Sequence, residues 1–133
     1  MRGFIPHSNE EGRVTPWEYL PCSAITPEIG MAMVFSSGKL AIATGTTKPT
    51  HICMEHHDAA VSAGTIVACI RVQADEVFEC TNSASLSGVN IGQKVTLHAS
   101  NGLQITGTTT SGVAELVAKD ADASGSRCLV RFS

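Results

Sequence analysis

The sequence has few aromatic and few charged residues. Of its 133 residues, 5% are aromatic and 16% are charged, whereas 43% are hydrophobic. So large an apolar fraction excludes a disordered chain and predicts a packed core. The core must be built mostly from Ala, Val and Ile, and burying even a Val or Leu side chain contributes only about 1.5–3 kcal/mol. We therefore expect association with copies or neighbouring proteins to add stability.

Clusters of basic residues and long apolar runs are also missing. The nine Lys and Arg residues are spread along the chain, and the formal net charge is −3. Because binding to a nucleic-acid backbone needs clustered cations, we expect no direct contact with nucleic acid. No window approaches the ~20 apolar residues that span a bilayer. The segment MRGFIPHSNEEGR lacks a signal-peptide core, so we expect neither membrane association nor export.

The five cysteines are odd in number and form no C-x-x-C pair. This pattern argues against both a zinc ribbon and a disulfide framework. Three of the cysteines lie in apolar runs, where a reduced thiol behaves as a small hydrophobic side chain. The sequence thus indicates a reducing compartment. The cysteines are Cys22, Cys53, Cys69, Cys80 and Cys128.

Proline is concentrated at the start of the chain, where four of the five prolines fall within the first 27 residues. Each proline fixes φ and pushes its predecessor into an extended conformation. Residues 1–29 are therefore predicted to form an extended N-terminal arm, with at most one helical turn around Trp17–Leu20. Ordering the arm costs roughly 1–2 kcal/mol per residue, so its aromatic side chains should dock on its own domain or on a neighbour.

From residue 30 onward, short apolar segments alternate with turn residues, and no segment has a sustained helical period. Asn101-Gly102 is the strongest hairpin signal. Residues 30–133 are therefore predicted to form an all-β domain, a small antiparallel barrel or sandwich. The expected strands are Met31–Phe35, Lys39–Thr44, Thr50–Glu55, Ile66–Val72, Glu76–Thr81, Lys94–Ala99, Leu103–Thr108, Val113–Lys119 and Arg127–Phe132.

One cluster of chemically active side chains occupies residues 51–58, with the sequence HICMEHHD. Imidazole, thiol and carboxylate groups are ligands of zinc and other transition metals. In the alternative interpretation, Cys53 packs inward and the histidines cap the solvent end of a strand. Since no established metal spacing occurs, we expect no metal and no cofactor. A small metal-dependent enzyme is kept as an alternative, and it would use His51, His56 and His57.

Other catalytic patterns are also missing from the sequence. No nucleophile elbow accompanies the cysteines and histidines, as a Cys–His hydrolase would need. The carboxylates of Glu10-Glu11 and of Asp75-Glu76 are adjacent in the chain, and adjacent carboxylates usually just face water. The glycines fall singly at strand ends, without a GxGxxG or P-loop motif. We therefore expect that the protein is not an enzyme.

Two segments resemble the core of lambda-type capsid decoration proteins, the head-stabilising or cement proteins of tailed bacteriophages. They are MAMVFSSGKLAIATGTTKPTHICM at residues 31–54 and IVACIRVQADEVFEC at residues 66–80. The ending, LHASNGLQITGTTTSGVAELVAKD followed by RCLVRF, resembles the second half of related phage head proteins. The resemblance covers most of residues 20–133, and it lies in the order of strands and turns. It implies a β-tulip-like fold.

The resemblance implies a virion protein that is made in the host cytoplasm and binds the exterior of the expanded head. There it would clamp neighbouring major capsid subunits together. Family members form trimers, and their N-terminal arms add to a capsid strand, so the implied partners are the major capsid protein and copies of this chain. A tail or neck component with a similar barrel is the alternative. The anchors of the arm would be Phe4, Ile5, Trp17, Tyr19 and Leu20.

Overall fold

The computed structural model describes residues 3–133 and contains eleven strands and no helix in that range. This confirms the predicted all-β fold. No helix long and apolar enough to cross a membrane occurs among these residues. The strands are β1 (Ile5–Ser8), β2 (Trp17–Pro21), β3 (Ala32–Ser36), β4 (Lys39–Ile42), β5 (His51–Cys53), β6 (Ile66–Arg71), β7 (Val77–Asn82), β8 (Lys94–Val95), β9 (Gln104–Ile105), β10 (Ala114–Lys119) and β11 (Arg127–Phe132).

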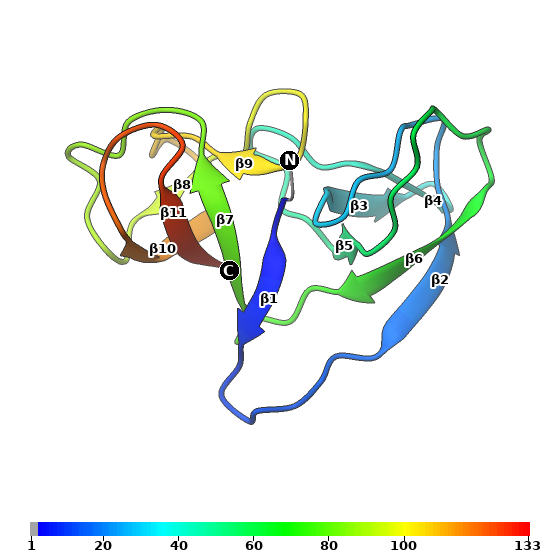
Figure 1. The fold of residues 1–133 in the computed structure, drawn as a ribbon, viewed down its shortest axis with the longest axis horizontal. Coiled ribbons are helices and arrows are strands. Elements are labelled where there is room, and N and C mark those ends of the chain that lie inside the picture. The colour runs from blue at the N-terminus through cyan, green and yellow to red at the C-terminus, as the bar shows by residue number, and fades with distance from the viewer. Residues whose placement is uncertain (1–2) are drawn as a thin grey trace.

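The strands form two sheets (Figure 1). The first has the order β1-β7-β11-β10-β8, and β9 also pairs with β7. The second has the order β2-β6-β5-β3-β4. Figure 1 shows the first sheet on the left and the second on the right, joined at the bottom by the loop between β1 and β2. The strand pairings are antiparallel apart from that of β7 with β9, which is parallel.

Further backbone contacts close five strands of each sheet into a ring, and β1 lies outside the ring of the first sheet. In the first sheet, Leu97 forms an antiparallel bridge with Ile105, which joins the chain after β8 to β9, and the Thr106 amide beside it donates to the Thr96 carbonyl at 2.9 Å. In the second, Cys22 forms a parallel bridge with Leu40, which joins the end of β2 to β4. Strand direction cannot alternate all the way round a ring with an odd number of strands. Each ring therefore needs one parallel contact, and these are the parallel contacts observed.

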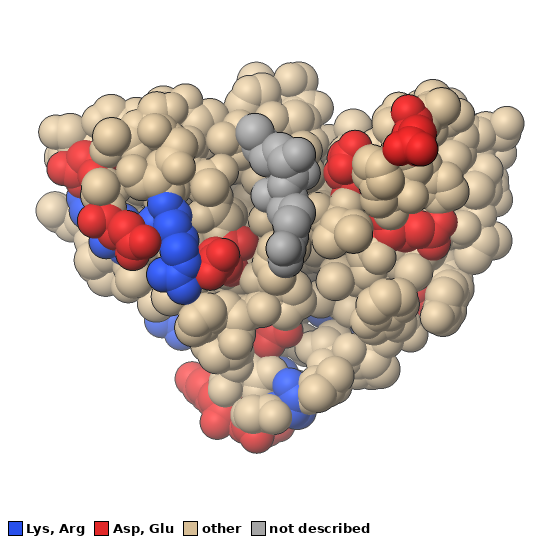
Figure 2. All heavy atoms as spheres, in the orientation of Figure 1, with Lys and Arg blue, Asp and Glu red and all other residues tan. Residues whose placement is uncertain are grey.

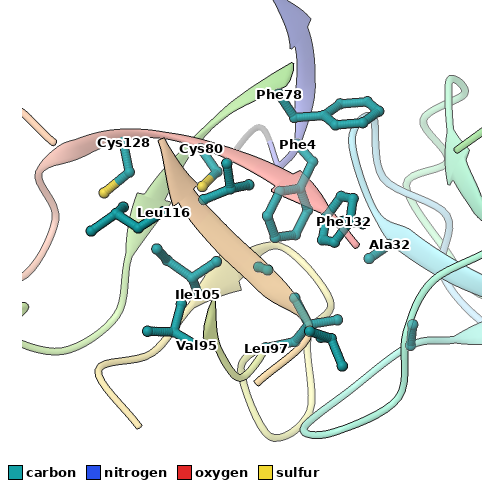
Figure 3. Packing of buried hydrophobic residues seen from close by; sticks show 14 of the residues in the cluster. Phe4, Ala32, Phe78, Cys80, Val95, Leu97, Ile105, Leu116, Cys128 and Phe132 are labelled. Atoms are coloured by element: carbon teal, nitrogen blue, oxygen red, sulfur yellow. The ribbon is translucent and has the colours of Figure 1, made fainter. Parts of the chain in front are cut away.

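The larger apolar core fills the first ring and extends to the second sheet (Figure 3). Phe4, Phe78 and Phe132 are fully buried there. The ring centroids of Phe78 and Phe132 lie 5.5 Å apart. Ile52 and Ile70 of the second sheet belong to the same cluster, so one face of that sheet packs on the first ring. Burial of β6 on both faces explains its continuous apolar sequence.

The second ring encloses a smaller core that is rich in sulfur. All five cysteines of the chain are buried free thiols in the structure, and three of them lie in this core. Burial raises the pKa of Cys53 to about 11, and burial likewise raises the pKa of Cys69 to about 11. Thiols in this state pack as small hydrophobic groups. The core residues are Cys22, Met31, Met33, Leu40, Cys53, Val67, Cys69 and Leu103.

The extended arm predicted over residues 1–29 is not confirmed; residues 1–2 lie outside the described part of the chain. Strand β1 pairs with β7, and β2 pairs with β6 along its whole length. Strand β2 also occupies the place where one helical turn was expected. Close backbone contacts fix the start of β1, because the Phe4 amide donates to the Gly30 carbonyl at 2.7 Å. A Cβ atom on Gly3 would lie 2.3 Å from that same carbonyl oxygen.

Two of the four prolines in this segment, Pro6 and Pro21, lie in strands at sheet edges. Strands β1 and β2 each stand at the end of a sheet order, and each contains a proline. Proline lacks an N–H group and is tolerated in edge strands, where one side of the backbone has no partner strand. The extended conformation was thus predicted correctly, whereas its partners within the fold were not.

Candidate functional site

An exposed apolar surface lies on β2 and the start of β6. Side chains alternate along a strand, so Trp17 and Tyr19 share one face of β2. Trp17 is 54% exposed and Tyr19 is 65% exposed. On β6, Ile66 pairs in register with Pro21 and is 54% exposed. We name Trp17, Tyr19 and Ile66 the β2/β6 surface.

The β2/β6 surface differs from the scattered apolar side chains found on most proteins. Tyr19 stands opposite Ala68 in the register, so Ile66 is its diagonal neighbour on the adjoining strand. Diagonal cross-strand neighbours lie within reach of an aromatic side chain. A group of large apolar side chains left in water is typical of a protein-interaction site. Aromatic residues are also the side chains that most often dominate binding energy at such sites.

The backbone of β2 is open along the same strand. The Cys22 amide donates to the Thr65 carbonyl at 2.9 Å, which makes Pro21 and Ile66 a non-hydrogen-bonded pair. By the same alternation, the N–H and C=O groups of Trp17 and Tyr19 point away from β6. The contact of β2 with β4 is confined to its end at Cys22, and no strand of the described residues pairs with Trp17 and Tyr19 on this side. Such an edge is a template for strand addition.

A cavity of about 220 Å³ lies beside Trp17, between β1 and β2. Its apolar lining includes Val14, Trp17, Met54 and Ile70. Val14 stands at the rim and is 91% exposed. The exposed apolar side chains therefore continue from the β2/β6 surface past Trp17 to Val14. We name this space the β1–β2 cavity.

The opposite face of β2 is held to β6 by charge. The Arg71 guanidinium donates from Nε and Nη2 to the two carboxylate oxygens of Glu18, both at 3.1 Å. These hydrogen bonds lower the pKa of Glu18. The fork spans the two strands in their observed register, in which Trp17 and Tyr19 stand on the other side of the sheet.

His51 is buried beneath this ion pair. Its Nδ1 lies 2.9 Å from the Thr50 hydroxyl oxygen. Its Nε2 lies 3.6 Å from the nearest Glu18 oxygen and has no hydrogen-bond partner within the described residues. Burial lowers the pKa of His51, although the Glu18 carboxylate opposes this effect. The imidazole is therefore a structural group that stays neutral at physiological pH.

The structure does not bring together the three histidines of the metal-enzyme alternative. His56 lies on the surface, 2.9 Å from both Glu28 and Asp58, and the hydrogen bond with Asp58 is the main cause of its raised pKa. His57 pairs with Glu55, whose other oxygen accepts the Ala68 amide at 3.0 Å. Within residues 3–133, no group of three His, Cys, Asp or Glu side chains is placed to hold a metal ion.

The five predicted anchors fall in different environments. Trp17 and Tyr19 are exposed, as a docking role requires. Ile5 and Leu20 are half-buried, and Leu20 packs against the second core. Phe4 is fully buried against Phe132, so its side chain stabilises the fold and is not available to a partner.

Two exposed residues of this region were missed from the sequence. Ile66 begins a strand that was predicted from a continuous apolar run, in which nothing distinguishes the exposed first residue from the buried ones that follow. Val14 lies in the loop between β1 and β2, where no local pattern marks it as part of a surface. Both positions follow from strand pairing between distant segments, which a local pattern does not encode.

Comparisons of the chain with protein-family models, with curated protein sequences and with solved structures found no match. A functional assignment therefore rests on the residues and on the geometry described above.

Proposed function

We propose that this chain is a virion structural protein that binds the outer surface of a tailed-bacteriophage head and stabilises contacts between major capsid subunits. The proposal starts from the resemblance of most of residues 20–133 to lambda-type decoration proteins. The observation that carries it is the pairing of exposed Trp17 and Tyr19 with an open backbone edge on β2. These features together suit attachment to another protein.

In this proposal, an extended segment of the capsid subunit adds to β2 as a further strand. Its backbone would pair with the outward N–H and C=O groups of Trp17 and Tyr19, which supplies affinity without specifying sequence. The two aromatic side chains would then be covered by the capsid. Aromatic residues bury about 150–250 Å² each and dominate the energetics of interfaces. Many copies on one shell would reinforce contacts that are weak individually.

The proposal includes self-association, because lambda-type decoration proteins are trimers. Three copies would stand together on the head, each contributing one β2 edge. Sedimentation equilibrium of the purified protein, over a range of concentrations, measures whether the trimer exists before attachment. A trimer that appears only on heads is equally compatible with docking through β2.

The number of copies in a virion tests the assignment to the head. Purified particles of the phage that encodes this chain would be separated by gel electrophoresis, and its band would be quantified against the major capsid protein. A head decoration protein should be present in an amount comparable with the capsid subunit. A tail or neck component, the alternative structural role, would give a small fraction of that amount. The protein's absence from particles would contradict both roles.

A further inference from the structure

The β1–β2 cavity has a polar wall as well as its apolar one. Glu76 lines the cavity and is only 4% exposed. One carboxylate oxygen accepts from Asn9 Nδ2 at 3.0 Å, and the other accepts from the Thr15 hydroxyl at 3.2 Å. Both donors are neutral. No Lys or Arg in the described part of the chain forms a salt bridge with Glu76.

This arrangement leaves the Glu76 carboxylate able to accept further hydrogen bonds. An ionised carboxylate has about four acceptor positions, and two donors occupy roughly half of them. A buried charge is costly unless it is paired with an opposite charge. A cation that entered the cavity would supply that charge.

The surroundings of Glu76 carry an excess of negative charge. Arg13 also lines the cavity, but its guanidinium is already engaged by Glu11 at 2.8 Å and Asp75 at 2.6 Å. The charge of this guanidinium is thus shared by two carboxylates, and it forms no salt bridge with a third, that of Glu76. Figure 2 shows acidic side chains gathered at the lower tip of the molecule, which in Figure 1 is the loop between β1 and β2. The charge of this end favours a cationic ligand.

The size of the cavity limits what can enter it. Pockets that bind whole small molecules measure on the order of 300–1,000 Å³. The β1–β2 cavity, at about 220 Å³, is smaller than that and fits a single side chain. The exposed indole of Trp17 adds a surface on which an ammonium or guanidinium group is attracted to the ring.

We propose that the β1–β2 cavity receives a basic side chain, Arg or Lys, from the protein partner. Its alkyl stem would lie against Val14 and Met54, and its charged end would contact Trp17 and Glu76. The inference rests on the proposed function only for the partner's identity, which would then be the capsid subunit that adds to β2. The preference for a cation follows from the residues that line the cavity and does not depend on which protein is the partner.

Isolated protein and a small probe test this preference. Trp17 is the only tryptophan of the chain, so its indole N–H resonance reports on this cavity without ambiguity. The protein would be titrated with n-butylguanidinium chloride and, at equal ionic strength, with n-butylurea, a neutral molecule of similar shape. We expect a saturable shift with butylguanidinium and an affinity for butylurea that is at least tenfold lower. Equal affinities, or no saturable shift with butylguanidinium, would overturn the proposal.

Two variants identify the group responsible. Glu76→Gln keeps the shape of the side chain, and Thr15 can accept a hydrogen bond from the new amide. It should lower the affinity for butylguanidinium at least tenfold and leave butylurea unchanged. Glu115→Gln, at an ion pair on β10, is the matched control and should change neither affinity. An unchanged Glu76→Gln affinity would overturn the role of Glu76. If wild-type protein fails to bind butylguanidinium, the measured copy number in virions is unaffected. The cavity proposal and the proposed function can therefore be contradicted independently.

Discussion

The ring of Phe4 packs edge-to-face against Phe132, with ring centroids 5.1 Å apart. This contact joins the beginning of the chain to its last strand, inside the larger core (Figure 3). The N-terminal segment is therefore part of the folded unit, and its removal would unfold the domain. Deleting the first 29 residues, a natural test of a docking arm, would for this reason not separate docking from folding.

The Phe4 contact predicts a large loss of stability in the Phe4→Ala variant. Removing a buried phenylalanine side chain costs about 3–5 kcal/mol. Urea unfolding followed by circular dichroism measures this difference. Val14→Ala is the control, because a substitution at so exposed a position usually changes stability by less than about 0.5 kcal/mol. Equal stabilities of the two variants would show that Phe4 is not part of the core.

Burial of the cysteines predicts slow chemical modification. With a pKa of about 11 for Cys53 and Cys69, about one of these thiols in a thousand is ionised at pH 8, and only the thiolate reacts. Ellman's reagent should therefore react with the native protein no faster than the domain opens. In denaturant, all five thiols should react at once. Rapid reaction of the native protein would contradict the burial of these groups.

Because His51 is buried, we expect the free energy of unfolding to decrease between pH 7 and pH 5. Burial holds its pKa in the folded state below the value of about 6.5 expected in the unfolded chain. The unfolded chain therefore binds more protons, and stability is present above pH 6.5 and falls as the pH decreases toward the folded pKa. His51→Gln cannot titrate, so its free energy of unfolding should fall less over this range. A wild-type slope no steeper than that of His51→Gln would contradict this account.

His56 provides the control with the opposite sign. Its pKa is raised by Asp58 and Glu28, so its contribution is present below pH 6.5 and is lost as the pH rises through the folded pKa. His56→Gln should therefore lose more stability than wild type between pH 7 and pH 5. Comparing slopes rather than absolute stabilities removes any effect of the substitutions on packing.

Strands supported by local pattern were predictable from the sequence. All nine strands expected after residue 30 are present, although most are shorter than predicted. Alternation and turn residues act within a few positions, as at Asn101-Gly102, where Gly102 has a positive φ of 64°. The all-β fold followed from such signals. The β-tulip-like fold and the trimer were implied only by the resemblance to lambda-type decoration proteins, and both stay predictions.

Features that depend on distant pairing were not predictable in the same way. β2 and β6 are separated by about fifty residues along the chain, and nothing in the sequence around Trp17 indicates that these two strands pair. The prolines correctly indicated extended backbone, but an arm and an edge strand share that signature. The β1–β2 cavity is a product of the same pairings, since Glu76 and Trp17 meet there only in the folded chain.

We propose that Trp17 and Tyr19 on the β2 edge attach this protein to a phage head. Co-sedimentation with expanded heads that lack the protein measures this attachment most directly. The assay would compare wild type with the double variant Trp17→Ser/Tyr19→Ser. The control is Phe35→Ser, which alters a partly exposed aromatic residue on β3. We predict that wild type and control bind equally, while the double variant loses affinity at least tenfold, as expected for two hot-spot aromatics, with its urea midpoint little changed. Wild-type affinity in the folded double variant would contradict the claim.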